Sequence, residues 1–178
     1  AELIKVLFEQ IQGKVGIVRP TFEEYPNRLN IEQVVDYRAK MPEFSYSADD
    51  LMTYFEDKKI SSLVLVNPDN PTGNYIPYKD CLRLAQWCEE RDIMFILDES
   101  FIDFSYEHPT FICNEVLEQF GCLVIIKSIS KSYGVPGLRL GILASSNAEL
   151  MTNARRSVSI WNINSFAEFF LQILGKYE

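Results

Sequence analysis

The sequence has little of what metal centres, membrane spans and nucleic-acid interfaces require. It contains one histidine, and its four cysteines form no C-x-x-C pair, so it offers no cluster of metal ligands. No apolar run reaches the ~18 residues of a membrane span, and the first ten residues show no signal-peptide pattern. A net charge of −8 provides no basic face for nucleic acid or anionic lipid. We therefore expect no bound metal and neither nucleic acid nor membrane as a partner.

The residues that are present indicate one globular domain. The chain has 178 residues, of which 47% are hydrophobic and 24% charged, with no repeat, low-complexity tract or internal linker. Cys81 and Cys88 would share one face of a helix, which predicts free buried thiols and a cytoplasmic protein. His108 is expected on a surface loop, not as a catalytic base. The chain opens on an amphipathic stretch without Met, and we expect it to be a fragment or excised domain.

Hydrophobic patterning predicts the α/β class. Continuous apolar runs at 63–66, 93–97 and 123–126 indicate strands that are covered on both faces, as in a parallel sheet. Helix-like segments alternate with these strands, so we expect three α/β/α layers around a mostly parallel sheet. Further strands are expected at 15–18 and 140–144, and helices at the start of the chain, after the N-cap Ser47, at 78–91, within 109–120, and over 147–178 with a break at 160–164.

Polar residues follow each of the three clearest strands. Asn70, Asp98 and Lys131 lie just beyond the first, second and third of them. Ligands of open α/β sheets bind outside the carboxyl ends of the strands, so these three residues are expected to meet in one crevice. Taken singly, Asp98 could cap a helix and Asn70 could serve a turn.

The most informative segment is 128–141, which reads Ser-Ile-Ser-Lys-Ser-Tyr-Gly-Val-Pro-Gly-Leu-Arg-Leu-Gly. A lysine amine forms Schiff bases with carbonyl cofactors, and an arginine fork beside hydroxyl groups suits a phosphate dianion. Both features together are what pyridoxal phosphate requires. Arg139 could instead form a surface ion pair, but Gly137 and Gly141 around it predict a closely packed backbone.

Three motifs in order, Asn-Pro-x-Asn-Pro-Thr-Gly, Asp-Glu-x-aromatic and Ser-x-Ser-Lys-x-x-Gly-x-x-Gly-x-Arg-x-Gly, resemble the class I/II aminotransferases of the aspartate aminotransferase fold. Within them, the chain is similar to the histidinol-phosphate aminotransferase and threonine-phosphate decarboxylase branch. The resemblance implies that residues 1–178 are the large domain of a fold-type I enzyme that binds pyridoxal 5′-phosphate. The amino-terminal arm, the turn before Ala1 and most of the small domain of such enzymes would be absent. It also implies amino acid and 2-oxo acid substrates and a homodimeric parent.

The resemblance assigns roles only to positions that match the family's motifs. These would be the Schiff-base lysine and proton carrier, a partner for the ring nitrogen, a partner for the phenolic oxygen, three phosphate contacts and an aromatic side chain stacked on the ring. They correspond in that order to Lys131, Asp98, Asn70, the set Ser128, Ser130 and Arg139, and Phe22. For Phe22 the alternative is an ordinary core aromatic residue.

One departure from the family leaves the reaction open. Phe101 occupies the position where aminotransferases of this group usually have a tyrosine, and the phenylalanine form is similar to the decarboxylase branch. The leading hypothesis is amino-group transfer of the histidinol-phosphate type. The alternatives are decarboxylation of a phosphorylated amino acid and a non-catalytic interaction module. We interpret Arg155 and Arg156 as solvated, and expect Lys127 to point away from the cofactor.

Overall fold

The computed structural model describes residues 1–106 and 110–177, so the expectation for His108 lies outside the described residues. One sheet has the strand order β2-β1-β3-β4-β5-β6. Its strands are β1 Lys14–Arg19, β2 Val34–Arg38, β3 Ile60–Val66, β4 Met94–Asp98, β5 Leu123–Ser128 and β6 Gly141–Ala144. The α-helices are α1 Glu2–Phe8, α2 Ala48–Phe55, α3 Tyr78–Glu89, α4 Asn114–Gln119, α5 Ile129–Ser132, α6 Ala148–Ser157 and α7 Ser165–Tyr177. Short 3₁₀ turns are η1 Pro26–Arg28, η2 Ile31–Gln33, η3 Ile102–Phe104 and η4 Pro136–Leu138.

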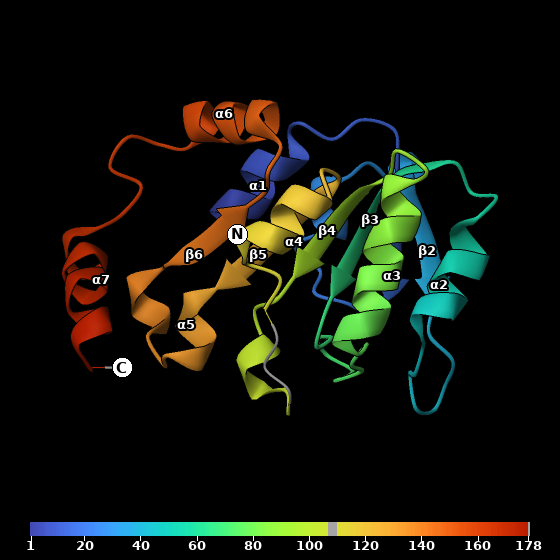
Figure 1. Cartoon of the computed structure of the whole chain (residues 1–178), viewed down its shortest axis with the longest axis horizontal. Helices are drawn as coiled ribbons and strands as arrows, with labels where there is room; N and C mark the ends of the chain where they lie inside the picture. The colour runs from blue at the N-terminus through green and yellow to red at the C-terminus, as the bar shows by residue number, and fades with distance from the viewer. Residues whose placement is uncertain (107–109, 178) are drawn as a thin grey trace.

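The sheet separates two apolar layers, which confirms the predicted α/β/α arrangement. Strands β1 to β5 are parallel, and only β6 runs antiparallel to its neighbour β5. Along β3, Leu63 and Leu65 belong to the core that contains α2 and α3, whereas Val64 and Val66 belong to the core that contains α1. In Figure 1, α2, α3 and α4 lie in front of the sheet. The continuous apolar runs are therefore explained by burial on both faces.

Local chemistry accounts for the helices that the sequence predicted. Ser47 caps α2, because its Oγ accepts the Asp50 amide at 3.2 Å. Helix α3 buries one face that includes Cys81 and Cys88, and all four cysteines are free thiols, as expected. The expected break near the carboxyl end is real, since α6 ends at Ser157 and α7 begins at Ser165. Among the described residues no helix is both long and apolar enough to cross a bilayer.

The strand order positions the site. From β1 the chain first moves outward to β2 and then returns to β3 on the other side of β1. The strand order therefore reverses between β1 and β3, and in open sheets of this kind ligands bind beyond the carboxyl ends of the strands at such a point. The loop after β1 carries Phe22 and Tyr25, and the loop after β3 carries Asn70.

Candidate active site

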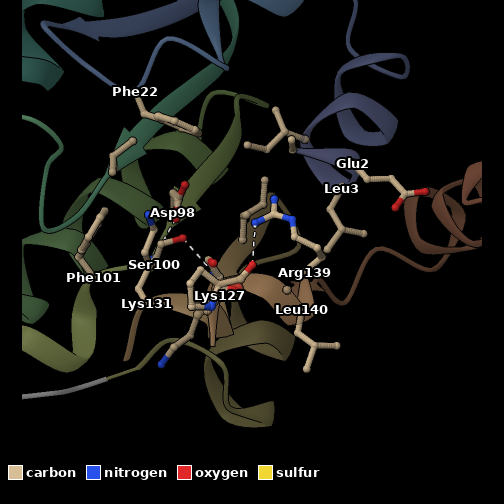
Figure 2. Close-up of a pocket in the computed structure, with 18 of the residues that line it drawn as sticks. Glu2, Leu3, Phe22, Asp98, Ser100, Phe101, Lys127, Lys131, Arg139 and Leu140 are labelled. Carbon is tan, nitrogen blue, oxygen red and sulfur yellow. Dashed lines mark hydrogen bonds between the residues drawn. The ribbon is translucent and has the colours of Figure 1, made fainter. Parts of the chain in front are cut away.

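A cavity of about 550 Å³ lies beyond the carboxyl ends of β1, β3, β4 and β5 (Figure 2). The structure brings together in its wall all seven side chains for which the sequence predicted a role: Phe22, Asn70, Asp98, Ser128, Ser130, Lys131 and Arg139. Asn70, Asp98 and Lys131 therefore share one crevice. In Figure 2, Asp98, Ser100 and Lys131 lie between Phe101 on the left and Arg139 on the right.

Asp98 is the buried acid of this cavity. It ends β4, is 4% exposed, and both of its carboxyl oxygens accept hydrogen bonds. The Tyr25 hydroxyl donates to Oδ2 at 2.5 Å, and the Ser100 amide donates to Oδ1 at 2.9 Å. Burial raises the pKa of Asp98 above its ordinary value, and hydrogen bonds from Ser100 and Tyr25 oppose that rise. The carboxyl group is thus fixed in orientation and held ready to pair with a cation.

Lys131 lies on α5, directly after β5. Its amine is 5.5 Å from the centroid of the Phe101 ring, which is a cation–π distance. The Lys131 side chain is exposed and lines the cavity. Lys127, which we expected to point away from the cofactor, also lines the cavity, but its amine is engaged by Asp103 at 2.8 Å. Of these two lysines, Lys131 has the amine that an incoming carbonyl group could reach.

Arg139 stands on the opposite wall. It adopts a left-handed backbone (φ 58°) at the end of η4, and its Nη1 donates to the Pro136 carbonyl at 3.2 Å. At Gly141 a Cβ atom would lie 3.2 Å from the Lys127 carbonyl oxygen, so the expected close packing is present there. The same expectation is wrong for Gly137, where a Cβ atom would meet nothing within 4 Å.

The two serines come from the junction of β5 and α5. Ser128 is half-buried, and its amide donates to Ser100 Oγ at 3.0 Å, which ties the ends of β4 and β5 together. Ser130 is buried, at 7% exposure. With Arg139 across the cavity, these hydroxyls form a donor set suited to a phosphate group.

Phe22 and Asn70 come from the loops on either side of the switch point. Phe22 is 41% exposed within the cavity wall, so it is not an ordinary core aromatic residue. Asn70 lies in a turn that two backbone hydrogen bonds close. The Gly73 amide donates to the Asp69 carbonyl at 2.9 Å, and the Asp69 amide donates to the Asn74 carbonyl at 2.8 Å. The turn places the half-buried Asn70 in the cavity wall without making it part of the core.

Sequence reasoning missed Tyr25 and Ser100, which hold Asp98. The only sequence signal for Tyr25 was a second aromatic residue three positions after Phe22. Arg155 and Arg156 are exposed on α6 and do not line the cavity, in agreement with the prediction that they are solvated.

The residues of the cavity fit pyridoxal 5′-phosphate. A buried carboxylate suits a basic ring nitrogen, an amide suits a phenolic oxygen, an accessible amine suits an aldehyde, and the guanidinium with its serines suits a phosphate. The volume is within the ~300–1,000 Å³ typical of small-molecule sites. These assignments of individual residues remain predictions.

Comparison with known proteins identifies relatives of the whole chain. The family described as "Aminotransferase class I and II" matches residues 1–173. CMP-5′-(3-aminopropyl)phosphonate synthase of Streptomyces rubellomurinus is 36% identical over 99% of this chain and 28% of its own length. L-serine phosphate decarboxylase of Campylobacter jejuni is 33% identical over 97% of this chain and 45% of its own. The crystal structure of histidinol-phosphate aminotransferase from Clostridium acetobutylicum superposes with a TM-score of 0.80, at 25% identity over 95% of this chain and 50% of that one.

The chain thus spans half or less of the length of these relatives. Their fold agrees with the mostly parallel sheet and flanking helices described above, which are those of the large domain of fold-type I enzymes.

Proposed function

The chain belongs to the class I and II aminotransferase family, and on that premise we propose that it is the cofactor-binding domain of an enzyme that acts on a phosphorus-bearing amino acid. The cofactor of this family is pyridoxal 5′-phosphate. The observation that carries the proposal is the convergence of Lys131, Asp98 and Arg139 in one cavity. These three residues supply an amine, a buried acid and a phosphate-binding cation.

Each side chain would perform one task. When bound, the cofactor supplies an aldehyde to which amines bond, and a ring that withdraws electrons from the substrate's α-carbon. Asp98 holds the proton on the ring nitrogen, because an adjacent carboxylate favours the cationic ring. Asn70 donates to the phenolic oxygen, and Phe22 covers the ring. Lys131 would hold the aldehyde and would move protons at the substrate's α-carbon as general base and acid.

The phosphate side anchors the cofactor. Arg139 is the charged contact, with Ser128 and Ser130 as hydroxyl donors, and together with Asp98 in the same wall they would keep the ring oriented. A fixed ring lets the site select which bond of the α-carbon is broken.

The substrate class is supported by the names of the relatives. A phosphonate synthase, a serine phosphate decarboxylase and a histidinol-phosphate aminotransferase all carry a phosphorus oxyanion in the names of their products or substrates. We propose a phosphate- or phosphonate-bearing amino acid with a 2-oxo acid as acceptor. Amino-group transfer remains the leading reaction.

Decarboxylation is the second candidate, and Phe101 is the observation in its favour. The Phe101 ring faces the Lys131 amine, so this wall of the cavity offers no hydroxyl donor where aminotransferases of this group have one. In either reaction Lys131 would be the proton carrier. The two reactions differ in whether Lys131 removes a proton from the α-carbon or returns one after carbon dioxide has left.

The first test concerns the lysine. The protein is loaded with pyridoxal phosphate, reduced with borohydride and mapped by peptide mass spectrometry. We expect the pyridoxyl group on Lys131, its loss in Lys131→Ala and its retention in the control Lys127→Ala. Modification of Lys127, or modification spread over surface lysines, would contradict the proposal.

The second test separates the reactions. The loaded protein is incubated with L-serine phosphate, L-threonine phosphate or histidinol phosphate, with and without 2-oxoglutarate. Glutamate that forms only with 2-oxoglutarate indicates transfer, whereas carbon dioxide released without it indicates decarboxylation. A protein labelled at Lys131 that forms neither product would support the non-catalytic alternative.

The homodimer is likewise a prediction, which size-exclusion chromatography with light scattering tests.

A further inference from the structure

Tyr25 is a completely buried phenol whose hydroxyl points at the acid of the site. Its side chain is 0% exposed, and its hydroxyl donates to Asp98 Oδ2 at 2.5 Å. This length is that of a charge-assisted O–H···O⁻ hydrogen bond, which is about twice as strong as a bond between neutral groups. A buried hydroxyl with this geometry is a fixed donor.

The surroundings leave Tyr25 little freedom to donate elsewhere. Its ring packs against Phe8 of α1, with centroids 5.7 Å apart, and lies edge-on to Phe22 at 6.2 Å. It belongs to the apolar core that also contains Val66 and Ile126 at the ends of β3 and β5. Packing on these sides aims the hydroxyl at the carboxylate.

The bond continues into a chain that spans the site. Asp98 Oδ1 accepts the Ser100 amide at 2.9 Å, and Ser100 Oγ accepts the Ser128 amide at 3.0 Å. Tyr25 is therefore connected through Asp98 and Ser100 to Ser128, so the acid and the phosphate side are fixed relative to one another.

We propose that Tyr25 is a positioning residue whose hydroxyl keeps the Asp98 carboxylate ionised and aimed at the ring nitrogen of the cofactor. This inference rests on the proposed function. Removing the donor would leave a 4% exposed carboxylate that keeps, among the described residues, its hydrogen bonds from Ser100, and a poorly solvated carboxylate takes up a proton. A protonated Asp98 cannot hold the ring nitrogen in its cationic form.

The electrostatic setting supports this reasoning. Burial raises the pKa of Asp98, and the hydrogen bonds from Ser100 and Tyr25 lower it, so loss of Tyr25 shifts the balance toward the protonated acid. Burial and, second to it, the Asp98 carboxylate raise the pKa of Tyr25. The phenol therefore keeps its proton and remains the donor. The other charged groups that share the cavity with Asp98 are the Ala1 amine, Glu2, Lys127, Lys131 and Arg139.

The experiment compares wild type with Tyr25→Phe, which keeps the ring and removes only the hydroxyl. In cofactor-free protein labelled with [γ-¹³C]aspartate, the Asp98 carbon signal, assigned with Asp98→Asn, is titrated by NMR. We expect it to titrate at higher pH in Tyr25→Phe. The matched control is Tyr54→Phe, which removes a tyrosine hydroxyl that donates to the Asp36 carbonyl at 2.7 Å, away from the cavity, and should change nothing.

The second readout is the dissociation constant of pyridoxal phosphate across the same pH range. Tyr25→Phe should bind about 10- to 100-fold more weakly at the acidic end, the scale of one lost hydrogen bond to a charged group. The difference should vanish at alkaline pH, where Asp98 is ionised in both proteins. A loss that is independent of pH would indicate only a structural role and would overturn the inference.

The outcomes separate this inference from the proposed function. If the Asp98 signal titrates identically in wild type and Tyr25→Phe, the inference is wrong even when cofactor binds at Lys131. If the signal shifts but neither protein binds pyridoxal phosphate, the proposed function is wrong, and the role of Tyr25 toward the cofactor fails with it. Should Tyr25→Phe not fold, 3-fluorotyrosine at position 25, an almost isosteric and stronger donor, should lower the pH at which Asp98 titrates, and an unchanged titration would refute the inference.

Discussion

Replacing Phe101 by tyrosine adds one hydroxyl group to the wall that faces Lys131. The Phe101 ring is half-buried, and its centroid is 5.5 Å from the Lys131 amine. In pyridoxal phosphate the phenolic oxygen is the ring substituent next to the aldehyde that Lys131 would bond. We therefore predict that a hydroxyl on this ring enters the region where that oxygen would lie.

The magnitude follows from the chemistry of the new bond. A hydrogen bond from a neutral donor to a charged oxygen contributes about 1.5–3 kcal/mol before the cost of removing the hydroxyl from water. Subtracting that cost for a half-buried ring leaves about 1.4 kcal/mol, which corresponds to one pH unit. Because the donor stabilises the phenolic oxygen as an anion, Phe101→Tyr should lower by about one unit the pH at which the bound cofactor changes its visible absorption.

The assay is a spectroscopic pH titration of the loaded protein. Phe104→Tyr is the matched control, since Phe104 is 65% exposed and is absent from the cavity wall, although its ring is 6.3 Å from that of Phe101. An unchanged titration in Phe101→Tyr would mean that position 101 does not face the phenolic oxygen. An equal shift in Phe104→Tyr would show that the effect is not specific to the wall.

Two other substitutions test the phosphate side and the loop that follows β4. Arg139→Ala should weaken binding of pyridoxal phosphate by about 10- to 100-fold, measured by absorbance titration, because a charge-assisted contact is lost, whereas Arg155→Ala on α6 should leave binding unchanged. Glu99 is buried, which raises its pKa above 4.5 against the hydrogen bonds from Phe111 and Thr110. The protonated Glu99 side chain therefore contributes stability that is fully present below pH 4.5 and is lost as pH rises through the raised pKa. Glu99→Gln should flatten that part of a plot of Tm against pH. An unaltered profile would contradict this reasoning.

The central strands and the site could be predicted from the sequence because both leave a strong local pattern. Continuous apolar runs mark strands buried on both faces, and in this chain each such run is followed within five residues by a polar residue that lines the cavity, as Asp98 does at the end of β4. The edge strand β2 was missed, because Val34–Arg38 is only half-buried along most of its length and carries Asp36 and Arg38. Unlike the other edge strand, β6, it lacks the continuous apolar run on which the prediction depended.

Contacts between distant segments could not be predicted in the same way. Tyr25 and Asp98 are far apart in sequence, and their hydrogen bond exists only because β1 and β4 end at the same edge of the sheet. The motif identified Asp98 as an acid in a site, but not what holds it. The glycine at position 137 shows the opposite failure, since a glycine in a motif suggested crowding and the fold leaves open space there.

The reversal of strand order between β1 and β3 has a consequence for folding. The cavity is assembled from segments near residues 22, 70, 98 and 131, each delivered by a different parallel strand, so no part of the unfolded chain presents it. A ligand of this cavity therefore binds the native state alone and draws the folding equilibrium toward it by mass action. At a free concentration one hundred times its Kd, such a ligand stabilises the chain by about 2.7 kcal/mol. If pyridoxal phosphate is that ligand, as proposed, its supply would offset a substitution of that cost in either core.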